Sequence, residues 1–334
     1  MSENCEIGGG RHVVLRRSLV DSTARFRHNG GRGGAVPTID PDFWIRPEIL
    51  RATHSWIDAA LLEDRAKDDI TSRVLLGSDS RLATATVTAG EDGVLCGADP
   101  AIEVFRRLDP AVEVSVTHGD GARVSKGEIV LELIGSAVPL LAAERTALNI
   151  LGHLSGIATT TRRWVDLAGS TQVLDTRKTF PGVRVFQRRA VAAGGGVNHR
   201  FDLAEFPLVK ENHRFLFGSG GAEEVPEIID RLRAEARGAP IEIEVEDEAS
   251  FRMAVEAGAD RILIDNQSPA EIARWIASAE ASGFDVDRAG LEASGGITGE
   301  TVAEYAASGV GRVSIGALTH TVRAFDVSLH VKWR

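Results

Sequence analysis

The hydrophobic pattern of the first half of the chain changes period twice. Apolar residues recur at helical spacing over 45–62, and residues 68–71, Asp-Asp-Ile-Thr, predict a turn or helix cap. Polar and apolar residues then alternate, which predicts antiparallel strands with one buried face. The predicted strands are 84–89, 112–116 and 129–133, with one helix over 100–108.

In the second half, predicted strands and helices alternate after a long helical stretch over 141–167, which predicts a connector between two domains. The predicted strands are short apolar runs at 172–174, 207–209, 241–245, 262–264, 290–293 and 313–315. The helices between them include 226–237, 249–257, 269–281 and 300–307. This alternation implies parallel strands covered by helices, and an α/β barrel, complete or incomplete, is the natural closure.

The first 40 residues differ from the rest of the chain. They are rich in glycine and arginine and poor in core-forming aromatics, so residues 1–40 predict a disordered extension. An organelle transit peptide is the alternative. Its typical composition is poor in acids, and Glu3, Glu6 and Asp21 argue against it.

Composition narrows the classes of function. No apolar run reaches the length of about 18 residues that a membrane span needs, so a cytoplasmic protein is expected. Cys5 and Cys96 are too far apart for a metal motif or a disulfide framework, and Cys96 is expected in the core. The formal net charge of −10 argues against nucleic-acid binding. An anionic ligand must therefore meet a local cluster of positive charge.

Every predicted strand of the second half ends in a polar residue or a glycine. The carboxyl ends of barrel strands share one face, where active sites form. The residues at these ends are Asp175 to Lys178, Lys210, Glu244, Asp265 with Asn266, Ser294 to Gly296, and Gly316.

Three glutamates alternate with aliphatic residues over 241–246, which puts the carboxylates on one face of the strand. Inside a barrel, at least one carboxylate would point inward and need a cation, a hydroxyl donor or a metal. A solvated edge strand is the alternative. Asp265, at the end of the next strand, favours the inward arrangement.

Positive charge is concentrated between residues 175 and 214, which include eight Lys or Arg against four Asp or Glu. Groups near strand ends can converge on a multiply anionic ligand through charge-assisted hydrogen bonds. The candidates are Arg177, Lys178, His199, Arg200 and Lys210. A solvated basic face is the expectation for Arg184, Arg188 and Arg189, on the helix predicted after residue 182.

Glycine runs supply a third feature of the same face. Residues 194–196 precede Asn-His-Arg at 198–200, and 294–298 is expected to open a helix whose first amides hold a phosphate. Residues 316–320 follow the next strand. Two adjacent strand ends of this kind predict a phosphate cradle.

Taken in order, these segments resemble quinolinate phosphoribosyltransferases, a family of type II phosphoribosyltransferases. The resemblance extends from about residue 45 to the C-terminus. The matching stretches are 144–149, 153–159, 175–179, 194–200, 209–213, 242–246, 264–266, 294–298 and 316–320.

The resemblance implies an α/β fold with two domains. An N-terminal open α/β sandwich, 41–147 plus 321–334, would stand beside an incomplete TIM-like α/β barrel, 148–320. It also implies a homodimer in which the sandwich domain of one chain caps the barrel of the other.

The resemblance further implies an activity: quinolinate and phosphoribosyl pyrophosphate would give nicotinate mononucleotide, pyrophosphate and carbon dioxide in NAD biosynthesis. Glu244 and Asp265 would hold the ribose hydroxyls and Mg²⁺, and with Lys178 they are the expected catalytic residues. Arg145 would reach into the site of the partner. The substrate carboxylates and phosphates would be bound by Arg177, Lys178, His199, Arg200 and Lys210, and the 5′-phosphate by Ser294, Gly295, Gly316 and His320.

Three alternatives remain open at this point. Residues 179–182 and 212–216 lean toward the molybdenum-transport-associated ModD relatives, so a phosphoribosyltransferase for another pyridine or aromatic acid is one. A barrel aldolase with Lys210 as a Schiff base is the second. A ligand sensor on the same fold is the third, although it would not need both Glu244 and Asp265.

Overall fold

The computed structural model describes residues 40, 42–77 and 81–334. The predicted disordered extension and Cys5 lie outside the described residues, Asp40 excepted. Cys96 is fully buried, as expected from the sequence.

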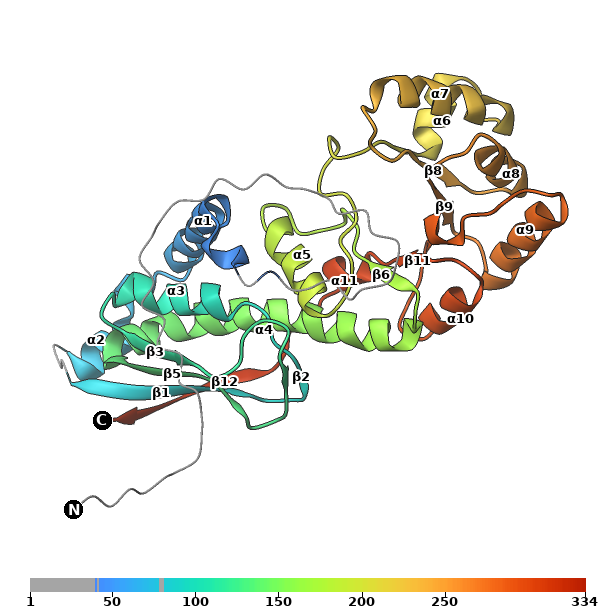
Figure 1. Cartoon of the computed structure of the whole chain (residues 1–334). Helices are drawn as coiled ribbons and strands as arrows, with labels where there is room; N and C mark the ends of the chain where they lie inside the picture. The colour runs from blue at the N-terminus through green and yellow to red at the C-terminus, as the bar shows by residue number, and fades with distance from the viewer. Residues whose placement is uncertain (1–39, 41, 78–80) are drawn as a thin grey trace, which may run out of the picture. The chain divides into compact units, whose positions relative to one another are not determined.

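The first part of the described chain is an antiparallel sheet with helices, as the alternating pattern predicts (Figure 1). Its strand order is β12-β1-β5-β3, and β1 buries its alanines and valine while its threonines stay partly exposed. The elements are η1 Phe43–Ile45, α1 Pro47–Glu63, η2 Ala66–Asp68, α2 Ile70–Leu76, β1 Leu82–Ala89, β2 Gly93–Val94, α3 Ala98–Leu108, β3 Glu113–Val116, β4 Arg123–Val124 and β5 Ile129–Ser136.

The cap predicted at residues 68–71 is present, but the helix that it begins was not predicted. The side chain of Asp69 accepts a hydrogen bond from the N–H of Ser72 at 3.1 Å and caps α2. Ile70, Val74 and Leu75 of α2 are exposed, so the helix has no clear apolar stripe that faces the core. The hydrophobic periodicity of this segment therefore does not predict a helix.

Helix α4, Ala137–Ala168, runs from the antiparallel sheet to the second part of the chain (Figure 1). The C-terminal segment crosses it, and the N–H of Phe325 donates to the carbonyl of Gly152 at 2.8 Å. A Cβ on Gly156 would lie 2.1 Å from the carbonyl oxygen of Arg323. Two glycines thus allow the segment to approach α4 before β12, Val327–Trp333, pairs with β1.

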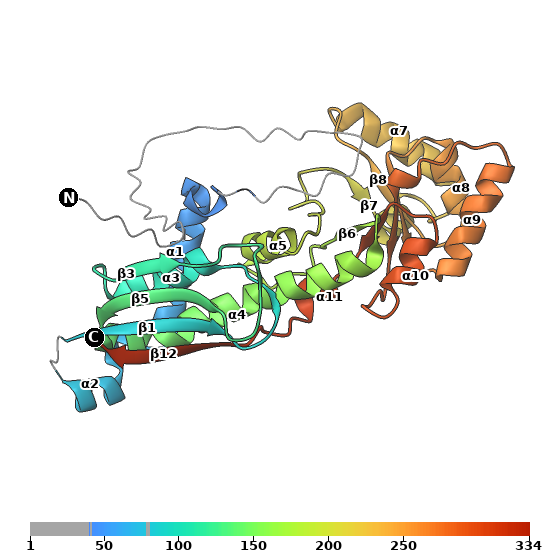
Figure 2. The same ribbon diagram turned by 60° about the horizontal axis from the view of Figure 1, so that its bottom comes forward.

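The second part is a parallel sheet with strand order β6-β11-β10-β9-β8-β7. Successive helices α7, α8, α9 and α10 contact one another along its outside (Figure 2). The strands are β6 Gln172–Leu174, β7 Leu208–Val209, β8 Glu242–Val245, β9 Arg261–Asp265, β10 Leu291–Ser294 and β11 Arg312–Ser314. The helices are α5 Arg184–Ala193, α6 Glu211–Phe217, η3 Ala222–Glu224, α7 Val225–Glu235, α8 Glu248–Glu256, α9 Pro269–Ala281, η4 Arg288–Gly290, α10 Val302–Ala307 and α11 Ala317–His320.

All six predicted strands are present, and the predicted α/β fold, an open sandwich followed by an incomplete barrel, is confirmed. The ladder ends at β6 and β7, and among the described residues Val197 only bridges to Leu174 of β6. The residue boundaries of the two domains stay a prediction. None of the described helices combines the length and the apolar character of a membrane span.

Helix α5 belongs to the second part and packs against the first. The expectation that its arginines form a solvated basic face was wrong. Arg189 is buried, and its Nε donates to Asp120 Oδ2 at 2.9 Å. The ring of Phe186, on the same helix, stacks on Trp56 at a centroid distance of 4.7 Å. Because this face of α5 packs against the first part of the chain, Arg189 loses water and is neutralised by a carboxylate instead.

Candidate active site

Polar residues from several strands lie at the carboxyl end of the parallel sheet, as expected. Asp265 ends β9 and stands in register with Ser294, which ends β10. The N–H of Asn266 donates to the carbonyl of Ser294 at 3.0 Å. Lys210 follows β7 directly. The parallel register therefore brings these residues to one edge.

Lys210 and Glu244 form an ion pair across neighbouring strands, between Nζ and Oε2. The Glu244 side chain is only 7 % exposed, whereas that of Lys210 is 47 % exposed. Strand β8 lies between β7 and β9, and Glu242 is fully buried. The alternative of a solvated edge strand for residues 241–246 was therefore wrong.

Three more carboxylates gather beside Glu244 of this ion pair: Glu246, Glu211 and Asp265. Burial raises the pKa of Glu246, and the nearby charges of Glu211, Asp265 and Glu244 raise it further. Like charges that raise a pKa in this way are mutually repulsive. Oxygen ligands of this kind suit Mg²⁺, and a divalent cation would relieve their repulsion. The residues present thus fit the ion that the family resemblance implies.

A second group joins the loops after β6 and β11. A Cβ on Gly316 would lie 2.9 Å from Cδ of Lys178 and 3.0 Å from Nε2 of His320. The hydroxyl of Thr319 donates to the carbonyl of Lys178 at 2.8 Å. Lys178 and His320 are both exposed at this point. The structure therefore brings together a lysine, a histidine and a glycine that leaves room between them.

The glycines after β10 lie against the loop after β9. Gly295 has φ of 95°, and a Cβ there would lie 2.2 Å from Oδ1 of Asn266. The expectation that 294–298 opens a helix was wrong, because α10 begins only at Val302, with Thr301 as its N-cap. The side-chain and backbone bonds between Thr298 and Thr301 form a turn in between. Any phosphate contact here comes from the turn and not from the helix end.

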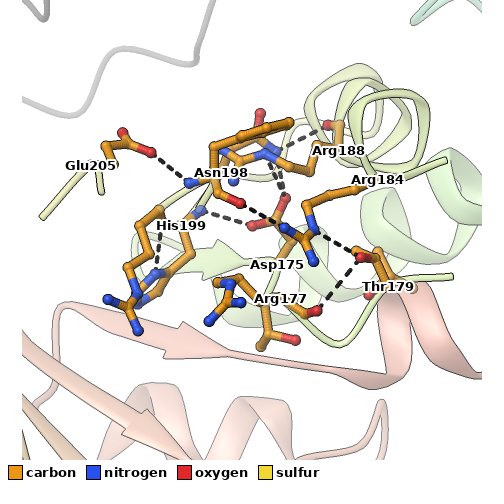
Figure 3. Close-up of polar contacts among 12 residues, drawn as sticks. Asp175, Arg177, Thr179, Arg184, Arg188, Asn198, His199 and Glu205 are labelled. Atoms are coloured by element: carbon orange, nitrogen blue, oxygen red, sulfur yellow. Dashed lines mark hydrogen bonds and ion pairs between the residues drawn. The ribbon is translucent and has the colours of Figure 1, made fainter. Parts of the chain in front are cut away.

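Asp175 is the centre of a buried polar network (Figure 3). It accepts hydrogen bonds of 2.7 Å from the backbone N–H of His199 and from Nδ2 of Asn198, and Nε of Arg188 lies 3.8 Å away. Burial raises the pKa of Asp175 to about 6, despite these partners. The network fixes the end of β6 to residues 198–199, and Arg188 is an ion-pair partner here, not part of a solvated basic face.

The third arginine of that predicted basic face, Arg184, also has partners. Its Nε donates to the hydroxyl of Thr179 at 3.0 Å, and Nη1 donates to the carbonyl of Phe201 at 3.1 Å (Figure 3). Arg184 therefore connects the loop after β6 to the residues that follow Arg200.

His199 and Arg200 are less accessible than expected for residues that bind substrate. Both are buried, at 7 % and 5 % exposure, and Nη1 of Arg200 donates to the carbonyl of Phe206 at 3.0 Å. The His199 ring points into the sheet, where Nε2 lies 3.3 Å from Glu242 and 3.4 Å from Glu292. Arg177, in contrast, is exposed.

The charge on His199 depends on opposing contacts. Burial disfavours the charge, but the hydrogen bonds to Glu242 and Glu292 outweigh it and raise the pKa of His199 to about 9. The N–H of Arg200, 2.7 Å from Nδ1, favours the neutral ring. The carboxylates of Glu242 and Glu292 both face Nε2, whereas a single backbone N–H faces Nδ1, so the charged ring is preferred.

Glu242 and Glu292 were not among the predicted site residues. With His199 they place ligand atoms within 4.8 Å of one another, a spacing that could suit a metal. A charged imidazole has no lone pair to offer, and Arg312 stands 3.9 Å from Glu292, so we interpret the cluster as an ion-pair network. A sequence signal existed: Glu242 and Glu292 each precede a predicted site residue, Glu244 or Ser294, by two positions on the same strand face.

Arg145 lies apart from these groups on α4. Its side chain is 65 % exposed, and its ion pair is with the adjacent Glu144 at 3.9 Å. Among the described residues, Arg145 makes no contact with Lys178 or Glu244 of the same chain. The predicted roles of Arg145 and of the other site residues stay predictions.

Comparison with known families accounts for most of the chain. A family model described as the N-terminal domain of quinolinate phosphoribosyl transferase matches residues 69–155, and one described as its C-terminal domain matches residues 157–330. The two models together cover both sheets except the last three residues of β12.

Individual relatives agree with the family models. The chain is 39 % identical to a probable carboxylating nicotinate-nucleotide pyrophosphorylase of Bacillus subtilis over 273 residues, 81 % of this chain and 90 % of the relative. It is 36 % identical to the carboxylating nicotinate-nucleotide pyrophosphorylase of Mycobacterium leprae, over 83 % of this chain and 96 % of the relative. A solved nicotinate-nucleotide pyrophosphorylase from Francisella tularensis superposes with a TM-score of 0.76 at 33 % identity, covering 84 % of this chain and 96 % of that one.

Proposed function

The chain belongs to the quinolinate phosphoribosyltransferase family, and we propose that it converts quinolinate and phosphoribosyl pyrophosphate to nicotinate mononucleotide, pyrophosphate and carbon dioxide, a step of NAD biosynthesis. The observation that carries the proposal is the Lys210–Glu244 ion pair, with Asp265 on the next strand, at the edge of the parallel sheet where Lys178 and Gly316 also lie. The lysines at this edge can bind a carboxylic acid and a phosphate, and the carboxylates of Glu244 and Asp265 can face a sugar.

The reaction begins at the anomeric carbon of the ribose. The bond to pyrophosphate breaks, the electron pair leaves with the pyrophosphate, and positive charge develops on the ribose. Glu244 and Asp265 stabilise this charge, because preorganised carboxylates in a partly buried site act without reorganisation. The pyridine nitrogen then donates its lone pair to the anomeric carbon and completes the glycosidic bond.

Decarboxylation follows from the same bond formation. The quaternised nitrogen withdraws electrons from the adjacent ring carbon, so the bond from that carbon to its carboxylate breaks and carbon dioxide leaves. The electron pair stays on the ring carbon and takes up a proton. Arg177 and Lys178 are exposed at the mouth and orient the two carboxylates, with Arg200 behind them. No covalent enzyme intermediate is required.

The buried positions of His199 and Arg200 divide the cations into two groups. Arg177, Lys178 and Lys210 have exposed side chains that a ligand can reach. His199 and Arg200 lie below them and contribute positive charge and support for the binding surface. The 5′-phosphate is assigned to Ser294, Gly295, Gly316 and His320.

We assign Mg²⁺ to Glu244 and Asp265, whose repulsion with Glu246 favours a divalent cation. When bound, this ion neutralises the charge of the leaving pyrophosphate. Lys210 already pairs with Glu244, so a bound ion would share this carboxylate with the ammonium group.

The site is completed in a homodimer in our proposal, because Arg145 is exposed and unused by its own site. A sandwich domain placed over the partner barrel would add this guanidinium to the exposed cations. A cytoplasmic location is proposed from composition. Some relatives are named chloroplastic or mitochondrial, so fractionation of cells that express the full chain is the check.

The aldolase alternative is disfavoured by one contact. A Schiff base requires a neutral, desolvated lysine amine. Lys210 instead forms an ion pair with Glu244 and keeps 47 % of its side chain exposed. Borohydride should therefore trap no carbonyl substrate on this residue.

The proposal is tested with the purified full chain, quinolinate, phosphoribosyl pyrophosphate and Mg²⁺, following carbon dioxide and pyrophosphate together. Equal release of the two is expected, and Lys178→Ala should lose it whereas Lys126→Ala, an exposed lysine of the first part of the chain, should not. Absence of both products in the wild type would contradict the proposal. Pyrophosphate release with another aromatic acid, and none with quinolinate, would favour the ModD-like alternative.

A further inference from the structure

Gln187 lies in the middle of α5 and is only 1 % exposed, yet all three hydrogen bonds of its side chain go to residues outside this helix. Its Oε1 accepts from the N–H of Phe180 at 2.9 Å, in the loop after β6. Its Nε2 donates to the carbonyl of Thr319 at 3.1 Å, in α11 after β11, and lies 3.1 Å from Nε2 of His153 on α4.

The set of partners requires an amide at position 187. The N–H of Phe180 needs an acceptor, and the carbonyl of Thr319 needs a donor. Burial lowers the pKa of His153, so its ring is neutral and its Nε2 can accept the second N–H of the amide. A carboxylate could accept from Phe180 and from the other tautomer of His153 but would leave the carbonyl of Thr319 without a donor, and an apolar side chain could serve none of the three.

The two loops that Gln187 joins carry groups of the proposed site. The loop after β6 carries Arg177 and Lys178, and the second loop consists of Gly316 and the short helix α11, which ends at His320. They also contact each other, because the hydroxyl of Thr319 donates to the carbonyl of Lys178 at 2.8 Å and a Cβ on Gly316 would clash with the Lys178 chain. A shift of either loop would therefore change the spacing between Lys178 and His320.

We propose that Gln187 is a positioning residue that sets the distance between the Lys178 loop and the Gly316–His320 loop, and thereby the fit of a phosphorylated sugar. Gln187 touches no substrate and acts through the two loops it joins. The inference rests on the proposed function in one respect, which is that these loops bind the phosphoribosyl group. The hydrogen bonds themselves do not depend on it.

The test is Gln187→Glu, which keeps the shape and the acceptor for Phe180 but removes both donors. At pH 8.5 the carboxylate would face the Thr319 carbonyl, and we expect KM for phosphoribosyl pyrophosphate to rise about tenfold or more with a smaller change in kcat.

Gln172→Glu is the matched control. Gln172 is exposed and begins β6, at the opposite end of that strand from Lys178. This variant should remain within about twofold of wild type at pH 8.5. A general sensitivity of the enzyme to added negative charge would appear in both variants and is thus separated from the effect of position 187.

A Gln187→Glu enzyme with wild-type KM at pH 8.5 would overturn the inference. Gln187→Met supplies a second measurement if the charged variant does not fold. It should lose affinity for phosphoribosyl pyrophosphate by calorimetry at every pH, and retained affinity would contradict the proposal. If the wild type binds phosphoribosyl pyrophosphate but releases no carbon dioxide with quinolinate, the proposed function fails. The affinity of the Gln187 variants for phosphoribosyl pyrophosphate, measured by calorimetry, would still test the role of Gln187.

Discussion

Replacing Gly156 by alanine has two opposing effects on the free energy of unfolding, each of known size. Alanine in a helix interior is favoured over glycine by about 1 kcal/mol. At position 156, however, the new Cβ would lie 2.1 Å from the carbonyl oxygen of Arg323, although real Cβ contacts stay beyond 3.0 Å. The C-terminal segment must move by about 0.9 Å, the difference between these distances. Overpacking of this kind costs about 1–3 kcal/mol.

The movement also strains a second contact. The N–H of Phe325 donates to the Gly152 carbonyl at 2.8 Å, and a displaced segment weakens this bond, worth about 1 kcal/mol. With the gain in helix propensity subtracted, the net loss is about 2 kcal/mol. With an unfolding entropy of about 2.1 cal/mol/K per residue over 334 residues, that loss lowers the Tm by about 3 °C.

The assay is thermal unfolding followed by circular dichroism, with Gly119→Ala as control. A Cβ on Gly119 meets nothing within 4 Å, so this variant should stay within about 0.5 kcal/mol of wild type. A Gly156→Ala protein with a raised Tm would show that helix propensity outweighs the contact. The account of how the C-terminal segment crosses α4 would then be refuted.

Further predictions concern the site. Asp265→Ala and Glu244→Ala should each lower kcat by about 10²–10³ and change ligand binding less, as steady-state kinetics and calorimetry would show; unchanged kcat would contradict their role. Mixed dimers of Arg145→Ala and Lys178→Ala chains should regain about a quarter of wild-type activity, because half of the dimers then carry one intact site, and activity no higher than that of the separate variants would argue against sharing. Chelation by EDTA should abolish turnover, with recovery on added Mg²⁺, and full activity in EDTA would remove the ion from the proposal.

Much of the fold could be predicted because burial leaves a periodic trace in the sequence. The glutamate row of residues 241–246 is an example: the side-chain period of a strand places Glu242 and Glu244 on one buried face, and both are buried. The ends of the six parallel strands were predicted for the same reason, and so was the edge at which Lys210, Asp265 and Ser294 meet. Strand β12 was not predicted, because the family resemblance only placed residues 321–334 in the sandwich domain and named no strand there.

What could not be predicted depends on contacts between distant segments. Arg189 looks like a surface residue beside Arg188, and only the position of Asp120, 69 residues away in sequence, explains its burial. The start of α10 was misplaced because two glycines and a threonine turn extend the loop before Thr301. Gln187 gave no signal either, since its partners lie 7, 34 and 132 residues away.

The most direct test of the account is a crystal structure of the chain with quinolinate bound. The two carboxylates are predicted to lie within hydrogen-bonding distance of Arg177 and Lys178, with the pyridine nitrogen directed toward the side where Glu244 and Asp265 stand. Quinolinate bound elsewhere would contradict this arrangement, for example in the largely apolar cavity of about 600 Å³ lined by Leu203, Leu208 and Phe217.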